Sequence, residues 1–259
     1  MASYQQIGLG TYKLQDAQCV SIIKAGLEIG YRQIDTAQLY RNHIQVSQGI
    51  KLSGIPREEI FIISKISNQN IRKLKIAESI DLIKKELDVE YVDLILLHNP
   101  VKNYEKAWED LIYCQTQFDI RNIGVSNFNI EHLEKIISNT NQNPWLNQIE
   151  LNIFNQQDKL IQYSKSKNII IQSHTTLTKT NLLHTEDLVQ LANMLELSSP
   201  NTMFKFVLDM GIGILPKTTN LTHLEQNYKL AGMKKIFDTD FYLKNGDLIK
   251  KFDIGYKIY

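Results

Sequence analysis

Short apolar runs alternate with longer amphipathic segments along the whole chain, and this alternation limits the possible folds more than any other feature. The runs predict eight strands, at residues 5–14, 31–35, 60–65, 91–98, 120–126, 145–151, 169–174 and 211–217. The amphipathic segments predict helices at residues 16–30, 44–52, 71–89, 104–117, 129–140, 156–168, 186–209 and 220–231, the last being the final clear helix. Asp16 is expected to cap the first helix and Gly30 to end it.

Strands that alternate with helices predict a parallel sheet. Eight such units in 259 residues fit an α/β fold of the closed (β/α)8 kind, the TIM barrel. A hydrophobic content of 43% supports one core, and we expect a single domain over residues 1–259. The alternative is an open doubly wound sheet. That fold usually places G-x-G-x-x-G after its first strand, but "IGLGTY" lacks this spacing, so the barrel is preferred.

Charge and composition exclude several classes of protein. The chain has 29 basic and 28 acidic residues, which gives no broad field to attract nucleic acid or an anionic membrane. No apolar stretch approaches the roughly 20 residues that span a bilayer, and the start lacks a signal-peptide pattern. We expect a cytoplasmic protein in which Cys19 and Cys114 are buried free thiols. The sequence does not determine the oligomeric state, for which a monomer is the default.

Polar residues stand where the predicted strands end, and a barrel places its chemistry at these C-terminal ends. Asp35, Lys65 and His98 end three successive strands, and Tyr40 follows in the loop after Asp35. These four side chains can converge at one barrel mouth. Further polar residues stand in or at the ends of the remaining strands: Ser126, Asn127, Gln148, His174 and Lys217.

The four side chains have complementary chemistry. A phenol has an ordinary pKa of about 10, and an adjacent lysine cation lowers that pKa because it favours the phenolate. An aspartate paired with the lysine holds the ammonium in place, and a neutral histidine can orient a carbonyl oxygen by a hydrogen bond. Together they form a proton donor for an oxygen that becomes an alkoxide. A hydride would have to come from a cofactor.

The segments "GLGTY", "GYRQIDTAQLYRN", "FIISK", "DLILLHNP", "IGVSNFN", "NQIELN" and "LPKT" resemble the successive motifs of the aldo-keto reductase superfamily, from about residue 7 to residue 227. The resemblance implies a (β/α)8 barrel that reduces aldehydes or ketones with NADPH. It implies a catalytic tetrad of Asp35, Tyr40, Lys65 and His98, with Tyr40 as the proton donor. It implies no metal.

The resemblance also implies the residues that bind the cofactor. Ser126, Asn127 and Gln148 would hold the nicotinamide carboxamide, while Lys217 and Thr218 would meet the adenosine phosphate. The full implied set is Gly10, Thr11, Tyr12, Ser126, Asn127, Gln148, His174, Leu177, Lys217, Thr218, His223, Gln226 and Asn227. NADP(H) is the favoured cofactor, and NAD(H) is the alternative.

The chain departs from the family pattern at several places. His174, in "SHTTL", replaces the tyrosine that stacks on the nicotinamide, and His223 stands where relatives that prefer NADPH carry arginine. The motif "RNH" keeps Asn42 but has His43 in place of glutamate. Most of an N-terminal hairpin is missing, and the loop after His98 and the C-terminal tail are short.

Other residues are expected to be structural: Trp108 and Trp145 as packing residues, and His43, His132 and His184 on the surface.

The leading hypothesis is an NAD(P)H-dependent reductase of a small-molecule carbonyl substrate. Two alternatives remain open from the sequence: a cofactor-binding regulatory subunit with the same fold, and a decayed enzyme with weak turnover. The complete tetrad favours catalysis, whereas "SHTTL" weakens the expected cofactor site.

Overall fold

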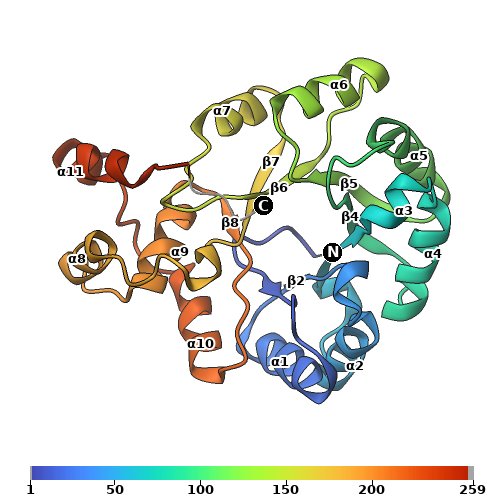
Figure 1. Cartoon of the computed structure of the whole chain (residues 1–259). Helices are drawn as coiled ribbons and strands as arrows, with labels where there is room; N and C mark the ends of the chain where they lie inside the picture. Colours follow the sequence, from blue (N-terminus) through green and yellow to red (C-terminus); the bar gives the residue numbers. More distant parts are fainter. Residues whose placement is uncertain (1, 256–259) are drawn as a thin grey trace.

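Eight parallel strands form one sheet in the order β1 to β8 in the computed structural model, which describes residues 2–255 (Figure 1). The sheet closes because Ile7 bridges Ile214 and the Gly8 amide donates to the Ile214 carbonyl at 3.0 Å. The predicted (β/α)8 barrel is therefore confirmed, and the open doubly wound alternative is excluded. The strands are β1 (Leu9–Gly10), β2 (Gln33–Asp35), β3 (Phe61–Ile66), β4 (Val92–Leu97), β5 (Ile120–Ser126), β6 (Leu146–Glu150), β7 (Ile170–His174) and β8 (Gly213–Ile214).

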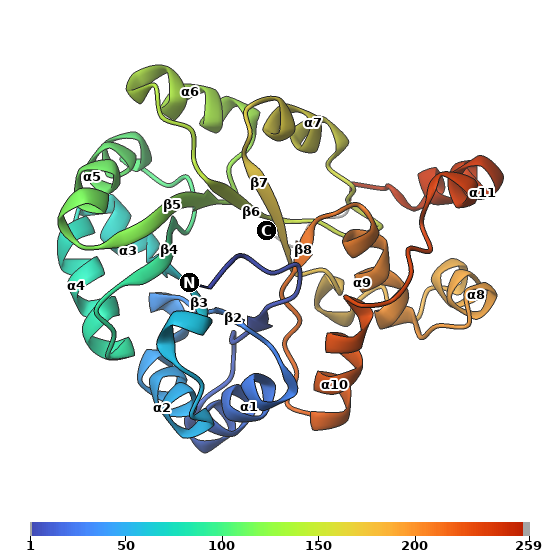
Figure 2. The ribbon, with the colours of Figure 1, turned by 180° about the vertical axis from the view of Figure 1, so that it is seen from behind.

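Helices surround this sheet, as the views from both ends show (Figures 1 and 2). The α-helices are α1 (Asp16–Ile29), α2 (His43–Ser53), α3 (Asn68–Arg72), α4 (Ile76–Leu87), α5 (Tyr104–Gln117), α6 (Ile130–Thr140), α7 (Asp158–Ser166), α8 (Glu186–Met194), α9 (Ser199–Asp209), α10 (Leu221–Leu230) and α11 (Thr239–Phe252). Three 3₁₀ turns lie in loops: η1 (Gln38–Tyr40), η2 (Arg57–Glu59) and η3 (Thr178–Thr180). Both views place α8 and α11 farthest from the barrel axis.

The central strands are buried on both faces, as their nearly continuous apolar sequences predict. Every residue of β3 and β4 is buried. Because side chains alternate along a strand, one set packs under the helices and the other fills the barrel. The inner set forms a cluster of its own, made of Phe61, Ile63, Leu94, Leu96 and Leu146. Because these side chains fill the interior, a ligand could bind only at the ends of the strands.

The floor of the barrel is filled by the extended segment 2–6, not by a hairpin. The ring of Tyr4 packs edge-on against Phe61 and Trp145, with centroids 6.3 and 5.9 Å away. A Cβ atom at Gly213 would lie 2.1 Å from the Tyr4 hydroxyl oxygen, so a glycine is needed there. Tyr4 thus fills the floor, and Trp145 is a packing residue as predicted.

Two predicted long helices are each divided in the structure. The predicted helix 71–89 is wrong because Leu74 has a φ of 53°, which separates α3 from α4. The predicted helix 186–209 is wrong because Pro200 lies in the first turn of α9 and cannot continue a preceding helix. The Ser198 side chain accepts a hydrogen bond from the Asn201 amide and caps that new helix.

Other predicted boundaries also need correction. Asp16 is the first residue of α1 and not its cap, whereas Gly30 ends that helix, with a φ of 127°, as predicted. The segment 220–231 is not the last helix, because α11 follows it. The first and last predicted strands pair over only two residues each. The prediction of one domain over 1–259 stays a prediction, and residues 1 and 256–259 lie outside the described part.

His43 is buried, and the prediction that it lies on the surface is wrong. Its Nδ1 lies 2.8 Å from Glu86 Oε2, and its Nε2 lies 3.0 Å from Ser64 Oγ. His132 is half-buried and closes a capping box with Asn129 at the start of α6. His184 is exposed, as expected.

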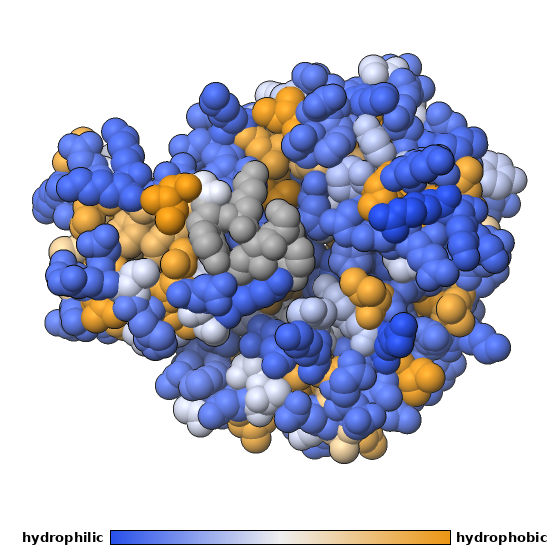
Figure 3. All heavy atoms as spheres, viewed as in Figure 1, coloured by the Kyte–Doolittle hydropathy of each residue, from blue (hydrophilic) through white to orange (hydrophobic). Residues whose placement is uncertain are grey.

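The buried tryptophan and cysteine residues are found as predicted. Trp108, Cys19 and Cys114 are buried, and both cysteines are free thiols. Hydrophilic residues dominate the face in Figure 3, with smaller apolar areas that include one over α8 and α11 at the left. No helix within residues 2–255 is both long and apolar enough to cross a membrane.

Candidate active site

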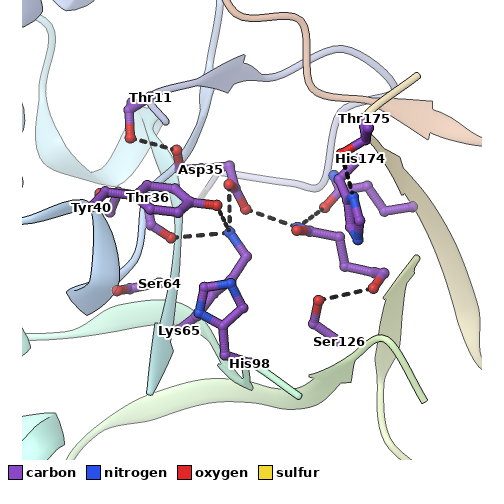
Figure 4. A network of polar contacts seen from close by, with 12 residues as sticks. Thr11, Asp35, Thr36, Tyr40, Ser64, Lys65, His98, Ser126, His174 and Thr175 are labelled. Carbon is purple, nitrogen blue, oxygen red and sulfur yellow. Dashed lines mark hydrogen bonds and ion pairs between the residues drawn. The ribbon is translucent and has the colours of Figure 1, made fainter. Parts of the chain in front are cut away.

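Lys65 is the centre of a buried polar cluster at the C-terminal ends of β2 and β3 (Figure 4). Its Nζ donates to Asp35 Oδ1 at 2.5 Å, to the Thr36 carbonyl at 3.1 Å and to the Tyr40 hydroxyl at 3.3 Å. These three contacts use all three N–H bonds of the ammonium. Burial lowers the pKa of Lys65, although the charge of Asp35 opposes this change. The ammonium is thus held at one point beside the phenol.

Tyr40 is positioned by the short turn η1, and Asn42 fixes the loop that follows. The Asn42 Nδ2 donates to the carbonyls of Thr11 and Leu14, both at 2.9 Å. Its Oδ1 accepts from the Thr36 hydroxyl at 2.9 Å. Asn42 therefore ties the loop carrying Tyr40 to the segment after β1, a role that the motif comparison did not reveal.

His98 completes the predicted group of four. Its ring stands edge-on to the ring of Tyr40, with centroids 6.1 Å apart. Burial, followed by the charges of Lys65 and His174, lowers the pKa of His98 to about 3. Its Nδ1 is buried and has no hydrogen-bond partner among residues 2–255. An unmatched acceptor costs less than an unmatched N–H, so we place the proton of this neutral ring on Nε2, as a donor toward the barrel mouth.

The second oxygen of Asp35 is held by Gln148, from the opposite side of the barrel. Gln148 Nε2 donates to Asp35 Oδ2 at 2.8 Å and to Gln172 Oε1 at 2.9 Å. Both hydrogens of that amide nitrogen are therefore used inside the protein. If Gln148 binds a nicotinamide carboxamide, as the resemblance implies, only its Oε1 is left for that contact. This oxygen can accept a hydrogen bond but cannot donate one.

Ser126, Asn127 and His174 are joined at the ends of β5 and β7. The Asn127 Nδ2 lies 3.1, 2.9 and 3.1 Å from three acceptors that share its two hydrogens, namely the His98 carbonyl oxygen, Asn99 Oδ1 and Ser126 Oγ. Three acceptors identify this atom as the nitrogen, so its Oδ1 is the atom 2.7 Å from His174 Nε2. His174 Nε2 must then carry a hydrogen.

The imidazole of His174 is neutral and fixed in one tautomer. With the hydrogen on Nε2, its Nδ1 accepts from the Thr175 hydroxyl at 2.9 Å (Figure 4). Burial, followed by the charges of Lys65 and Lys179, lowers the pKa of His174 to about 3. This position therefore offers a planar uncharged ring. Neither Asn99 nor the link between Asn127 and His174 was predicted from the sequence.

Three residues implied to bind the cofactor, Gly10, Thr11 and Tyr12, lie at the end of β1 and just after it. They differ in how accessible they are to a ligand. Gly10 lies against β8, where a Cβ atom would be 2.7 Å from the Leu215 carbonyl oxygen. The Thr11 hydroxyl donates to the Asp35 carbonyl at 2.9 Å and is buried, so it supports β2. Tyr12 is 42% exposed, and its ring centroid lies 5.1 Å from that of Tyr40. Tyr12 is therefore the residue of these three that is open to a ligand.

The residues implied for the adenosine end form a separate group along the segment from β8 into α10. Lys217 and His223 are exposed, and Thr218 is half-exposed. The Asn220 side chain accepts from the His223 amide and begins α10. Gln226 is exposed and Asn227 is buried. No contact described above joins this group to the tetrad.

The loop after β7 is strained, which the sequence did not predict. Thr175, Thr178, Lys179 and Thr180 all have φ between 49° and 73°. Such values are rare for β-branched residues and cluster at functional sites. Leu177, implied at the cofactor, lies half-buried within this loop.

Two groups of residues in the structure fit two parts of a nicotinamide nucleotide. Amide and hydroxyl groups of Ser126, Asn127 and Gln148, beside the neutral ring of His174, match an uncharged carboxamide-bearing ring. The exposed Lys217 and the start of α10 match an anionic group. Tyr40 and Lys65, which can deliver a proton, lie next to His98.

Comparisons with known proteins agree with this geometry. Residues 6–241 match the model of the "Aldo/keto reductase family". The chain is 34% identical over 232 residues to methylglyoxal reductase DkgB of Escherichia coli O157:H7, which covers 88% of this chain and 87% of that protein. It is 32% identical over 234 residues to a 9,11-endoperoxide prostaglandin H2 reductase of Trypanosoma cruzi strain CL Brener, covering 88% and 83%.

Solved structures give the same result. The aldo-keto reductase MGS-M4, from a Medee basin deep-sea metagenome library, superposes with a TM-score of 0.88 at 30% identity, covering 99% of this chain and 94% of that one. A point mutant of Gox0644 in complex with NADPH superposes with a TM-score of 0.88 at 28% identity, covering 98% and 92%.

Proposed function

Because this chain belongs to the aldo/keto reductase family, a family of nicotinamide-dependent carbonyl reductases, we propose that it reduces small aldehydes with NADPH and that Tyr40 donates the proton. The observation that carries the proposal is the contact of Lys65 with both Asp35 and Tyr40. A phenol is a poor proton donor near neutral pH unless a cation favours its anion. Lys65 supplies that cation at a fixed place.

The neighbouring side chains would orient the carbonyl group. The Nε2–H of His98 donates a hydrogen bond to the carbonyl oxygen, and the Tyr40 hydroxyl gives that oxygen its proton as negative charge develops there. Asp35 keeps the ammonium of Lys65 in place while the phenol changes its charge. When bound, the reduced nicotinamide supplies the hydride.

The cofactor would lie along the ends of β5 to β8. Ser126, Asn127 and Gln148 hold the carboxamide, and the neutral ring of His174 packs against the nicotinamide face. A neutral His174 suits this place because a cation there would repel the oxidised, positively charged ring.

A preference for NADPH over NADH would depend on Lys217, Thr218 and His223. NADPH carries an additional 2′-phosphate, and Lys217 and His223 are exposed cations or potential cations beside the start of α10. A lysine is a point charge, whereas the arginine of many relatives would bind phosphate with a planar fork. We therefore propose a moderate preference for NADPH.

Methylglyoxal is the first substrate to test, because several relatives, DkgB among them, are named methylglyoxal reductases. Within the described residues, only 98–103 connect β4 to α5, and this short loop supplies few apolar walls beside His98. A site with few apolar walls buries little ligand surface and discriminates weakly. We therefore expect turnover of several short aldehydes with Michaelis constants of roughly 1 mM.

The test is to follow NADPH oxidation with methylglyoxal and a panel of other aldehydes and ketones, using Tyr40→Phe as the matched control. Turnover by the parent and its loss in the variant would support the proposal. A parent that binds NADPH but reduces no carbonyl in the panel would instead favour a cofactor-binding regulatory subunit or a decayed enzyme.

A further inference from the structure

Gln172 places a second buried amide inside the barrel, below the residues that the proposed function uses. It lies on β7, is fully buried, and accepts from Gln148 Nε2 at 2.9 Å through its Oε1. Its own Nε2 makes no hydrogen bond of normal geometry to the described residues, although its side chain is near enough to the Tyr4 hydroxyl to affect the pKa of that phenol. A buried amide nitrogen without a good partner costs free energy, so an apolar residue would suit the barrel interior better unless the Oε1 of Gln172 has a task.

The Oε1 of Gln172 helps to set the orientation of the Gln148 side-chain amide. One hydrogen of Gln148 Nε2 goes to Asp35 Oδ2 and the other to Gln172 Oε1. If the Gln148 amide turned over, its oxygen would face the carboxylate of Asp35 with no hydrogen between them. Asp35 is paired with Lys65, so its carboxylate is the charged acceptor that selects the nitrogen.

Asp35 by itself fixes only one of the two N–H bonds. The Gln148 side chain could then rotate about its last bonds and still keep that single contact. A second acceptor, placed on the next strand, removes this freedom, because two N–H directions define the plane of the amide. The Gln148 Oε1 is then the amide atom that remains for a ligand.

We propose that Gln172 is a positioning residue, which holds Gln148 so that its Nε2 supports Asp35 and its Oε1 accepts from the nicotinamide carboxamide. This inference rests on the proposed function, since it assumes the same cofactor. Gln172 touches neither substrate nor cofactor. Gln172 would link cofactor binding to proton donation, because the Gln148 amide that it orients contacts both the nicotinamide carboxamide and the Asp35–Lys65 pair.

Gln33 provides a matched control. It lies on β2, is also fully buried, and also has an Nε2 without a partner among the described residues. Its Oε1 accepts from the Gln5 amide at 3.1 Å, in the floor segment, and not from Gln148. Gln33→Met therefore removes an amide of equal size from the same interior and leaves the Gln148 contacts in place.

The experiment compares the parent with Gln172→Met, Gln172→Glu and Gln33→Met. For each we would measure the NADPH dissociation constant by fluorescence titration, the melting temperature, and kcat/KM with methylglyoxal. Because one hydrogen bond is lost, we expect Gln172→Met to bind NADPH about 3- to 10-fold more weakly than the parent. We expect kcat/KM to fall further, because the hydrogen bond from Gln148 to Asp35 is then also less well fixed.

Glutamate at position 172 would be kept protonated by its burial, so its carbonyl oxygen would still accept from Gln148. Gln172→Glu should therefore bind NADPH within about twofold of the parent. Gln33→Met should change the melting temperature without changing NADPH binding. If Gln172→Met does not fold, Gln172→Val is the second variant that removes the acceptor, since a β-branched residue suits a strand.

The proposal is overturned if removing the acceptor leaves NADPH binding within twofold of the parent, or if Gln33→Met weakens it equally. Failure of the proposed function looks different: the parent would bind NADPH but reduce no carbonyl, and the binding comparison would still decide the role of Gln172. A parent that binds no NADPH overturns both.

Discussion

The ammonium nitrogen of Lys65 lies 3.3 Å from the phenolic oxygen of Tyr40, although Lys65 belongs to β3 and Tyr40 to the turn after β2. The same nitrogen is bound to Asp35 and to the Thr36 carbonyl, so it cannot follow the phenol if the loop moves. In the proposed function, proton donation by Tyr40 would therefore depend on the loop that Asn42 anchors as much as on Lys65.

Tyr40→Phe should lower carbonyl reduction by about 10²- to 10⁴-fold, the usual range for loss of a general acid. NADPH binding should change little, because the lost hydroxyl contacts Lys65 and, in the proposed function, serves the carbonyl oxygen and not the nucleotide. Steady-state rates and a fluorescence titration check the two parts. Near-parental rates in the Phe variant would show that another group donates the proton.

Lys65→Met should reduce activity and move the high-pH limb of the rate profile to higher pH. The sign follows from the contact: a cation favours the phenolate and lowers the phenol pKa, so its removal lets that pKa rise. Asp35→Asn should act in the same direction but more weakly, since the ammonium remains. Rate profiles of the parent and both variants test the coupling, which an unmoved limb would contradict.

His174→Tyr should make the stability of the protein less dependent on pH in the acid range. The pKa of His174 is about 3 in the folded chain and about 6.5 when unfolded, so the unfolded chain binds more protons between these values. Stability conferred by the neutral ring is present above pH 6.5 and is lost as pH falls toward 3. Between pH 7 and pH 5 the parent should lose about 2 kcal/mol more than the variant.

The control for this measurement is His184→Gln, because His184 is exposed. Chemical unfolding of all three proteins at pH 7 and pH 5 gives the comparison. Equal losses in the parent and in His174→Tyr would mean that the ring of His174 carries its proton in the folded protein.

His223→Arg should tighten NADPH binding by about 1–2 kcal/mol and leave NADH almost unchanged. Arginine binds phosphate through a planar fork of N–H donors that histidine lacks, so the parental preference for NADPH should be modest and should grow in this variant. Lys217→Ala should weaken NADPH more than NADH. Equal affinities for both cofactors in the parent, unchanged by His223→Arg, would place the 2′-phosphate elsewhere.

Gly213→Ala should destabilise the barrel by about 1–3 kcal/mol, because the added methyl group would lie 2.1 Å from the Tyr4 hydroxyl oxygen. Tyr4→Phe in the same chain should recover part of this loss by removing that oxygen. A double-mutant cycle of unfolding free energies tests the contact. Independent effects of the two substitutions would show that Tyr4 does not fill this part of the floor.

The barrel and the tetrad could be predicted because both follow local rules. Strand period, helix period and the position of a polar residue at a strand end are visible over a few residues, and they place Asp35, Lys65 and His98 together. The burial of His43 could not be predicted in this way, because its partners Ser64 and Glu86 belong to β3 and α4. The same holds for Gln172, whose partner lies on β6.

Helix α11 was missed for a related reason. Its sequence contains Gly246 and has many charges, so its intrinsic helix preference is low. The structure stabilises it at both ends: the Asp238 side chain accepts from the Phe241 amide, and Phe252 packs on Phe154 in the loop after β6. The cap at Asp238 is local, but the packing of Phe252 on Phe154 is tertiary, and a single-sequence pattern does not contain it.

The contact of Tyr4 with Gly213 has a consequence for how the chain is made. The floor of the barrel is shared between the segment that precedes β1 and the last strand, β8, and the bridge of Ile7 with Ile214 closes the sheet at the same place. Strands β2 to β7 can pair in order during synthesis, whereas the N-terminal segment must wait for β8. Until then the paired strands have open edges, so this last closure is the step at which crowding, a fused N-terminal tag or a chaperone would act on the yield of folded protein.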